Sequence, residues 1–251
     1  MKTIAPSNTF SFSRFVQLCK RTVELNISSW LMGLAAVVGI LLIIWFFPIS
    51  TGGNAWHGFR IESLLPAALF FFVVGGLFIT SSLFNELHSP TTAFQHLTLP
   101  ATALEKLLSA WAISTVLYTL ASLVIYFLLT LIIQLISGLT STADLSIRLF
   151  NPFDFSLAES VISYFYYHSI FLLGAVYFVK NNFLKTLLSI VLVVSTLIVI
   201  TGLVFFVSAG TLAFQFSTDD LGSGVIHTIS ILFSLFMLTF AWIRLKNRQV
   251  A

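Results

Sequence analysis

The sequence predicts an all-α membrane protein with six transmembrane helices, and three observations support this fold class. Hydrophobic residues make up 58% of the 251 residues, charged residues make up 8%, and the mean hydropathy is +1.01. A soluble domain carries about 25% charged residues and could not cover this much apolar surface. The charges also fall in clusters, and the stretches between them are continuously apolar. This composition excludes a soluble enzyme, a nucleic-acid-binding protein and a disordered chain.

The spans follow from six runs that contain no Asp, Glu, Lys or Arg and are each 20 residues or longer: 25–59, 63–85, 107–143, 160–179, 186–218 and 221–243. About 20 apolar residues cross a hydrocarbon core of about 30 Å, so each run holds one helix. Strands of a membrane barrel would instead alternate in segments of about 10 residues. We expect helices near 30–47, 65–84, 107–136, 159–179, 186–209 and 223–243. They form a transmembrane domain over 30–243, between an N-terminal segment 1–29 and a tail 244–251.

The distribution of basic residues predicts the orientation. With six spans, both termini share one side of the membrane with the 2–3 and 4–5 loops. That side holds ten of the twelve Lys and Arg residues, and the opposite side holds only Arg60 and Arg148. Because basic residues accumulate in cytoplasmic loops, both termini are expected in the cytoplasm.

Residues 12–27 predict an amphipathic helix ahead of the first span. At about 100° per residue, one side is apolar and the other carries Arg14, Lys20, Arg21 and Glu24 among polar residues. Such a helix suits the membrane interface, either as a plain anchor or as a more specific element. The membrane-facing residues are Phe12, Phe15, Val16, Cys19, Val23 and Ile27.

The loop between spans two and three predicts a short helix of its own. Ser89 followed by Pro90 reads as an N-cap with proline at the first helical position, and the helix should end before Pro100. Thr102 with Glu105 three residues later predicts a capping box that starts the third helix. A short helix between two long helices can transmit force from a soluble partner, although an ordinary loop would explain the same residues.

The chain lacks the residue patterns of common catalytic and metal sites. The single cysteine, Cys19, excludes an intrachain disulfide and a cysteine metal site. No phosphate-binding loop, H-E-x-x-H or G-x-S-x-G pattern occurs, and no carboxylate, lysine or arginine lies at mid-membrane depth. We therefore expect no enzymatic activity, metal or bound cofactor in this chain. His168, in the fourth span, is expected to be a packed, hydrogen-bonding residue.

Two features carry a resemblance to a known family. An N-terminal amphipathic helix, six spans, cytoplasmic ends and a short 2–3 helix resemble the ABC type-2 exporter permeases. In addition, LTLPATALEKLLSAW (97–111) is similar to a pattern of small six-span, permease-like proteins, often from Bacteroidetes. The layout covers nearly the whole chain, and the motif covers about 15 residues.

The resemblance implies a function in the bacterial inner membrane. The short helix would be the coupling helix that docks on a separate ABC ATPase subunit, which binds ATP and Mg, and the permease would work as a homodimer or heterodimer. The coupling residues implied are Ser89, Pro90, Thr91, Thr92, Ala93, Phe94, Gln95, His96 and Leu97, with Pro100, Thr102, Glu105 and Lys106 as the neck beneath span three. The apolar mid-membrane positions favour an amphipathic or lipid-like cargo. The alternative is a non-transporting scaffold or regulatory subunit whose loop binds a cytoplasmic partner.

Overall fold

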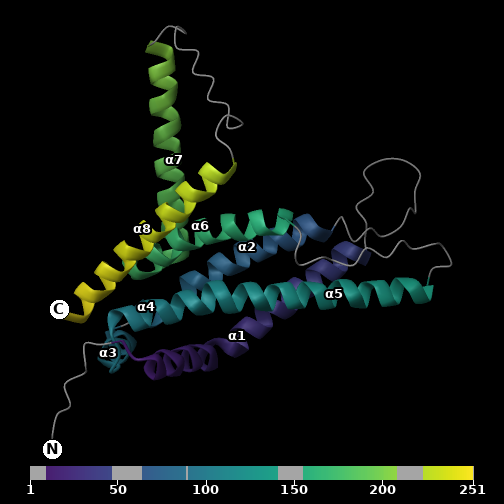
Figure 1. Ribbon diagram of the computed structural model, residues 1–251, viewed down its shortest axis with the longest axis horizontal. Helices are drawn as coiled ribbons and strands as arrows, with labels where there is room; N and C mark the ends of the chain where they lie inside the picture. The colour runs from purple at the N-terminus through teal and green to yellow at the C-terminus, as the bar shows by residue number, and fades with distance from the viewer. Residues whose placement is uncertain (1–9, 47–63, 89, 141–154, 208–222, 251) are drawn as a thin grey trace, which may run out of the picture.

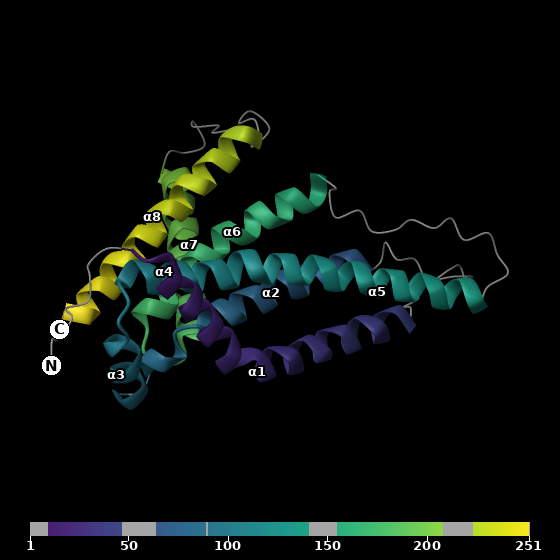
Figure 2. The same ribbon diagram turned by 60° about the horizontal axis from the view of Figure 1, so that its bottom comes forward.

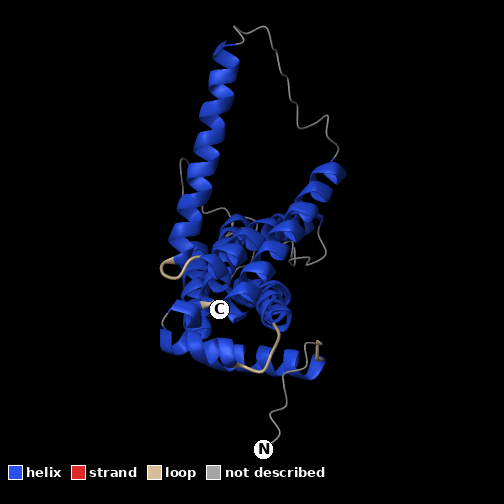
Figure 3. Ribbon diagram, turned by 90° about the vertical axis from the view of Figure 1, so that its left-hand side faces the viewer, coloured by secondary structure: helices blue, strands red, loops and turns tan. Residues whose placement is uncertain are grey.

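The computed structural model of the protein describes residues 10–46, 64–88, 90–140, 155–207 and 223–250. Within these ranges every regular element is a helix (Figure 3). In chain order the elements are α1 (Phe12–Phe46), α2 (Leu64–Ser82), η2 (Asn85–His88), α3 (Pro90–Thr98), α4 (Ala103–Trp111), η3 (Ala112–Leu117), α5 (Tyr118–Thr140), α6 (Phe155–Tyr177), α7 (Asn182–Val207) and α8 (Ser223–Val250). The π-helical turn η3 joins α4 to α5 without a break.

Five helical stretches in the described residues are long and apolar enough to cross a membrane: Phe12–Trp45, Leu64–Leu87, Ala103–Ile136, Asn182–Val204 and Gly224–Arg248. They coincide with five of the predicted spans, so the chain is an all-helical protein with several membrane-spanning helices. The predicted span at 159–179 falls on α6, which is not among the five. Helix α6 carries polar residues such as Tyr164, His168 and Ser169, and all three are buried against other helices rather than exposed.

The first helix differs from the prediction of a separate interfacial helix followed by a span. Helix α1 is continuous from Phe12 to Phe46, and no proline interrupts this stretch. Figure 2 shows that its first turns run in a different direction from the rest of the helix. The amphipathic segment 12–27 and the predicted first span near 30–47 are therefore two parts of one continuous helix, and these parts keep different directions.

The main hydrophobic core lies at one end of the bundle, which we call the base. Buried residues from the segment that follows α2, from α4 and from the C-terminal ends of α6 and α8 meet there, including Phe84, Leu107, Val176 and Leu245. A smaller core lies further along α1, α2 and α5, around Leu41, Leu64, Leu129 and Ile133. Figure 1 shows α3, α4, the start of α1 and the C-terminal end of α8 together at the base. The described segments that the sequence analysis assigns to the cytoplasmic side thus gather at one end.

Candidate functional site

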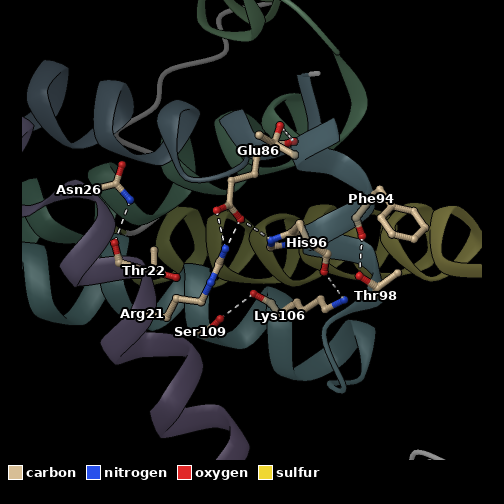
Figure 4. Close-up of polar contacts among 10 residues, drawn as sticks. Arg21, Thr22, Asn26, Glu86, Phe94, His96, Thr98, Lys106 and Ser109 are labelled. Atoms are coloured by element: carbon tan, nitrogen blue, oxygen red, sulfur yellow. Dashed lines mark hydrogen bonds and ion pairs between the residues drawn. The ribbon is translucent and has the colours of Figure 1, made fainter. Parts of the chain in front are cut away.

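Helix α3 is attached to the first transmembrane helix through Glu86 of η2. The Arg21 guanidinium of α1 donates to both carboxylate oxygens of Glu86, at 3.0 and 2.7 Å. Nδ1 of His96, on α3, lies 2.8 Å from the same carboxylate (Figure 4). A two-pronged arginine–carboxylate pair fixes orientation as well as distance. Glu86 therefore links α1 to α3. Its partner Arg21 is 65 residues away in the sequence, and its partner His96 is 10 residues away.

A second connection joins α3 to the helix that continues into the membrane. The buried ammonium of Lys106, on α4, donates to the backbone carbonyl of His96 at 2.7 Å. Because that carbonyl lies near the C-terminal end of α3, the cation also meets the negative end of the helix dipole. Helix α3 is thus held from two sides, by Glu86 and by Lys106.

The neck between α3 and α4 contains a buried carboxylate. Glu105 has no exposed surface, and its carboxylate accepts from Arg14 Nη2 at 2.8 Å and from the Ser11 backbone N–H at 2.6 Å. It also accepts from the Thr102 backbone N–H at 2.8 Å, while Thr102 Oγ1 accepts from the Glu105 N–H at 3.2 Å. The predicted capping box is confirmed. We call Arg14, Arg21, Glu86, His96, Glu105 and Lys106 the basal polar cluster.

Removing the cap hydroxyl should weaken the neck without disturbing the ion pairs. Thr102→Ala is expected to lower the free energy of unfolding by about 1 kcal/mol, because the Glu105 N–H loses its partner at the helix start. Thermal unfolding of the detergent-solubilised protein would measure this change. Thr102→Ser, which keeps the hydroxyl, should stay close to the wild type, and an equal loss in both variants would contradict a capping role.

The predicted docking residues include both an exposed and a buried side chain. Ser89 lies outside the described residues, and 90–97 lies in α3. Phe94 is 69% exposed, and its ring points away from the cluster (Figure 4). His96 is buried and held by Glu86, so it positions α3 rather than offering a surface. Of the predicted neck, Pro100 lies in the exposed bend before α4, and the other three residues carry the contacts described above.

The predicted membrane-interface residues of α1 include some that are exposed and others that pack against the protein. Phe12, Val16 and Ile27 are exposed, as expected of a face in contact with lipid. Cys19 and Val23 instead pack against the basal core. Arg14 and Arg21, which the sequence places on a water-facing side, point to the protein together with buried Leu18. The polar side of this segment therefore partly faces α4 and η2, because their carboxylates need partners.

A second polar cluster lies within the bundle, at the π-helical turn. Oγ of Ser114 is 2.6 Å from Nε2 of His168, and the Tyr164 hydroxyl donates to the Ser114 carbonyl at 2.6 Å. All three residues are fully buried. The expectation that His168 is a packed, hydrogen-bonding residue is confirmed. The contacts place α6 firmly against the η3 turn, a kind of helical irregularity that is frequent at functional sites.

Comparison with known proteins does not add to these observations. No protein-family model matches the sequence, and no curated protein or solved structure shows significant similarity to it. The sequence predicted some residues of the basal polar cluster but not the contacts between distant segments. Thr102, Glu105 and Lys106 stand in a readable motif, whereas the pairing of Arg21 with Glu86 and of Arg14 with Glu105 joins segments 65 and 91 residues apart.

Proposed function

We propose that this chain is the membrane subunit of an ABC-type exporter, in which α3 is the coupling helix for a separate ATPase subunit. The observation that carries the proposal is the attachment of α3. The helix presents an exposed phenylalanine, Phe94, while hydrogen bonds and an ion pair tie its opposite side to two long helices. A surface loop without a mechanical role would not need such attachments.

The contacts offer a route for force from α3 to the membrane. A displacement of α3 would act on α1 through Glu86 and Arg21, and on α4 through Lys106. Helices α4, η3 and α5 follow one another without a break and form one long continuous helix. Movement of α4 would therefore be passed to α5 within the membrane. The contacts of the buried Glu105 and Lys106 side chains at the base favour movement of these elements as a unit, since breaking them would leave a buried charge without its hydrogen bonds.

The proposal includes the finer features that the sequence predicts. Helix α6 is the fourth of six spans, both termini and α3 lie in the cytoplasm, and the membrane is the bacterial inner membrane. The working unit contains two permease subunits, as a homodimer or a heterodimer, and two ATPase subunits that bind ATP and Mg. Hydrolysis of ATP by those subunits drives export of an amphipathic cargo. The energy-coupling chemistry lies entirely on the partner subunit.

Docking through Phe94 can be tested by co-purification with an ABC ATPase subunit that is co-expressed with this chain. We expect Phe94→Ala to lower ATPase recovery by about tenfold, as the loss of a central aromatic side chain does in protein interfaces. Phe70→Ala is the matched control, because Phe70 is similarly exposed at 60% but lies on α2. Unchanged recovery after deletion of 89–97 would contradict the coupling role.

Reconstitution separates the exporter from the scaffold alternative. In proteoliposomes that contain both subunits, an exporter should raise ATP hydrolysis when an amphiphilic cargo is added, and Phe94→Ala should abolish that increase. A complex that forms normally but never changes its ATP hydrolysis with any amphiphile would favour the scaffold or regulatory subunit instead.

A further inference from the structure

A cavity of about 630 Å³ lies between α1, α2 and α5, with a small contribution from the start of α6. These three helices run alongside one another in both Figure 1 and Figure 2. Its volume is within the range of about 300–1,000 Å³ that small-molecule sites occupy. It lies away from the basal polar cluster, and none of the six cluster residues lines it.

The lining of the cavity is mostly apolar, although Tyr118, Ser122 and Tyr126 of α5 and Ser160 of α6 also line it, and one end carries a group of polar residues. Leu34, Val38 and Leu41 of α1 face Leu65, Leu69 and Phe72 of α2. Toward the base, the lining changes to four uncharged polar residues on α1, α2 and η2, namely Asn26, Ser29, Ser82 and Asn85. The polar residues of α1 lie close to those of α2 and η2, because α1 leaves the base at the point where α2 returns to it.

Among the residues that the structure describes, no charged side chain lines the cavity. Near the polar end, Glu86 is next to the lining residue Asn85 and is neutralised by Arg21 through two hydrogen bonds. Glu24, two residues from Asn26, pairs with Lys20, and Glu159, next to the lining residue Ser160, is exposed. A ligand with a charged head group would therefore lose hydration here without gaining an opposite charge, which costs several kcal/mol. An uncharged head group with hydroxyls can replace its lost water contacts with the amide and hydroxyl groups at the polar end.

We propose that this cavity binds a neutral amphiphile with a single acyl chain. The chain lies between the apolar residues of α1, α2 and α5, and the hydroxyl-bearing head group lies beside Asn26, Ser29, Ser82 and Asn85. A second copy of this protein would be a poorer occupant, because an apolar helix would offer no partners for the hydrogen-bonding capacity that Asn26 and Ser82 retain beyond their bonds to the carbonyls of Thr22 and Ile79. The identification of this ligand as cargo rests on the proposed exporter function, whereas binding itself requires neither ATP nor the ATPase.

Trp30 provides a direct measurement, because its side chain lines the cavity. The isolated protein, placed in phosphatidylcholine nanodiscs, would be titrated with a monoacylglycerol that carries two bromine atoms on its acyl chain. Bromine quenches tryptophan fluorescence only at short range. We expect saturable quenching in the wild type, and loss of the saturable part in Trp30→Phe. Quenching that rises linearly without saturation would show only partition into the bilayer and would overturn the proposal.

Two glycines of α1 supply a matched pair of variants. A side chain at Gly33, which lines the cavity, would meet no other atom within 4 Å and would project into the open space. Gly39 is also free of neighbours within 4 Å, but it does not line the cavity. Both substitutions place a better helix former in the same helix, so neither should unfold the protein. We expect Gly33→Leu to weaken binding at least tenfold and Gly39→Leu to leave it unchanged.

The head group is tested with brominated lysophosphatidylglycerol of the same chain length, which carries a negative charge. It should bind at least tenfold more weakly than the monoacylglycerol, and equal binding would overturn the neutral head group. If Gly33→Leu instead converts a dimer into a monomer without changing quenching, the cavity is an interface between two copies and the proposal fails. None of these outcomes depends on Phe94 or on ATP hydrolysis, so failure of the binding site and failure of the exporter proposal are distinguishable.

Discussion

Replacing Glu105 with glutamine is expected to lower the free energy of unfolding by about 3 kcal/mol, because it removes the buried carboxylate that pairs with Arg14. Removal of one partner from a buried ion pair costs about 3–5 kcal/mol. The lower end applies here, since a quarter of the Arg14 side chain is still exposed to solvent. The glutamine also retains only one acceptor oxygen for three donors, namely Arg14 and the N–H groups of Ser11 and Thr102.

Glu24→Gln is the appropriate control for this experiment. Glu24 belongs to the same end of the protein and also pairs with a cation, Lys20, at 3.8 Å. The side chains of Lys20 and Glu24 are both more than 60% exposed, so this ion pair contributes only about 0–0.5 kcal/mol to stability. Thermal unfolding in detergent should therefore separate the two variants clearly. Equal stability of Glu105→Gln and wild type would mean that the buried pair does not hold the neck.

The membrane-spanning helices were predictable because the bilayer imposes a length and an apolar composition that are visible in the sequence. The charge-free runs located the five helices that are long and apolar enough to span, and the motif at Thr102 located the start of α4. Both signals are local in the sequence: a span is a continuous run of about 20 residues, and a capping box joins residues three positions apart. They are therefore available without knowledge of the fold.

The contacts within the candidate site could not be predicted in the same way. The amphipathic pattern of residues 12–27 separates polar from apolar sides, but it does not tell whether a polar side meets water or another helix. Arg14 and Arg21 meet Glu105 and Glu86 because the start of α1 packs against α4 and η2, a property of the tertiary structure. The same limit applies to His96, which shares a short helix with Phe94 but is buried.

The cavity between α1, α2 and α5 had no sequence signal, because its apolar lining is indistinguishable from residues that face lipid. Leu34 and Phe72 occur in spans that are apolar all round. Only the polar end could have been noticed, as Asn26 and Ser29 precede the first predicted span, Ser82 lies in the last turn of the second, and Asn85 follows it. Their proximity becomes evident only when α1 and α2 are placed antiparallel to each other.

Gly174→Leu is expected to separate α6 from α7 and to lower the free energy of unfolding by at least about 3 kcal/mol, at the upper end of the cost of overpacking. A Cβ atom at Gly174 would lie 2.9 Å from both Cβ and Cγ2 of Thr186 on α7, and still closer to its hydroxyl oxygen. The threonine has little freedom to move, because its side chain is branched at Cβ and its hydroxyl donates to the Asn182 carbonyl. The two helix backbones would have to move apart.

Two further variants show that close helix packing is the cause. Gly202→Leu, on α7, adds the same side chain where nothing lies within 4 Å, so it should leave the unfolding temperature nearly unchanged. Gly174→Ala should be destabilising alone and should recover part of the loss when combined with Thr186→Ala, which removes the hydroxyl and Cγ2. A Gly174→Leu protein as stable as the wild type would contradict the α6–α7 contact. Because most of α7 beyond Thr186 is exposed to the surroundings, this contact near its first turns carries much of its attachment to the bundle.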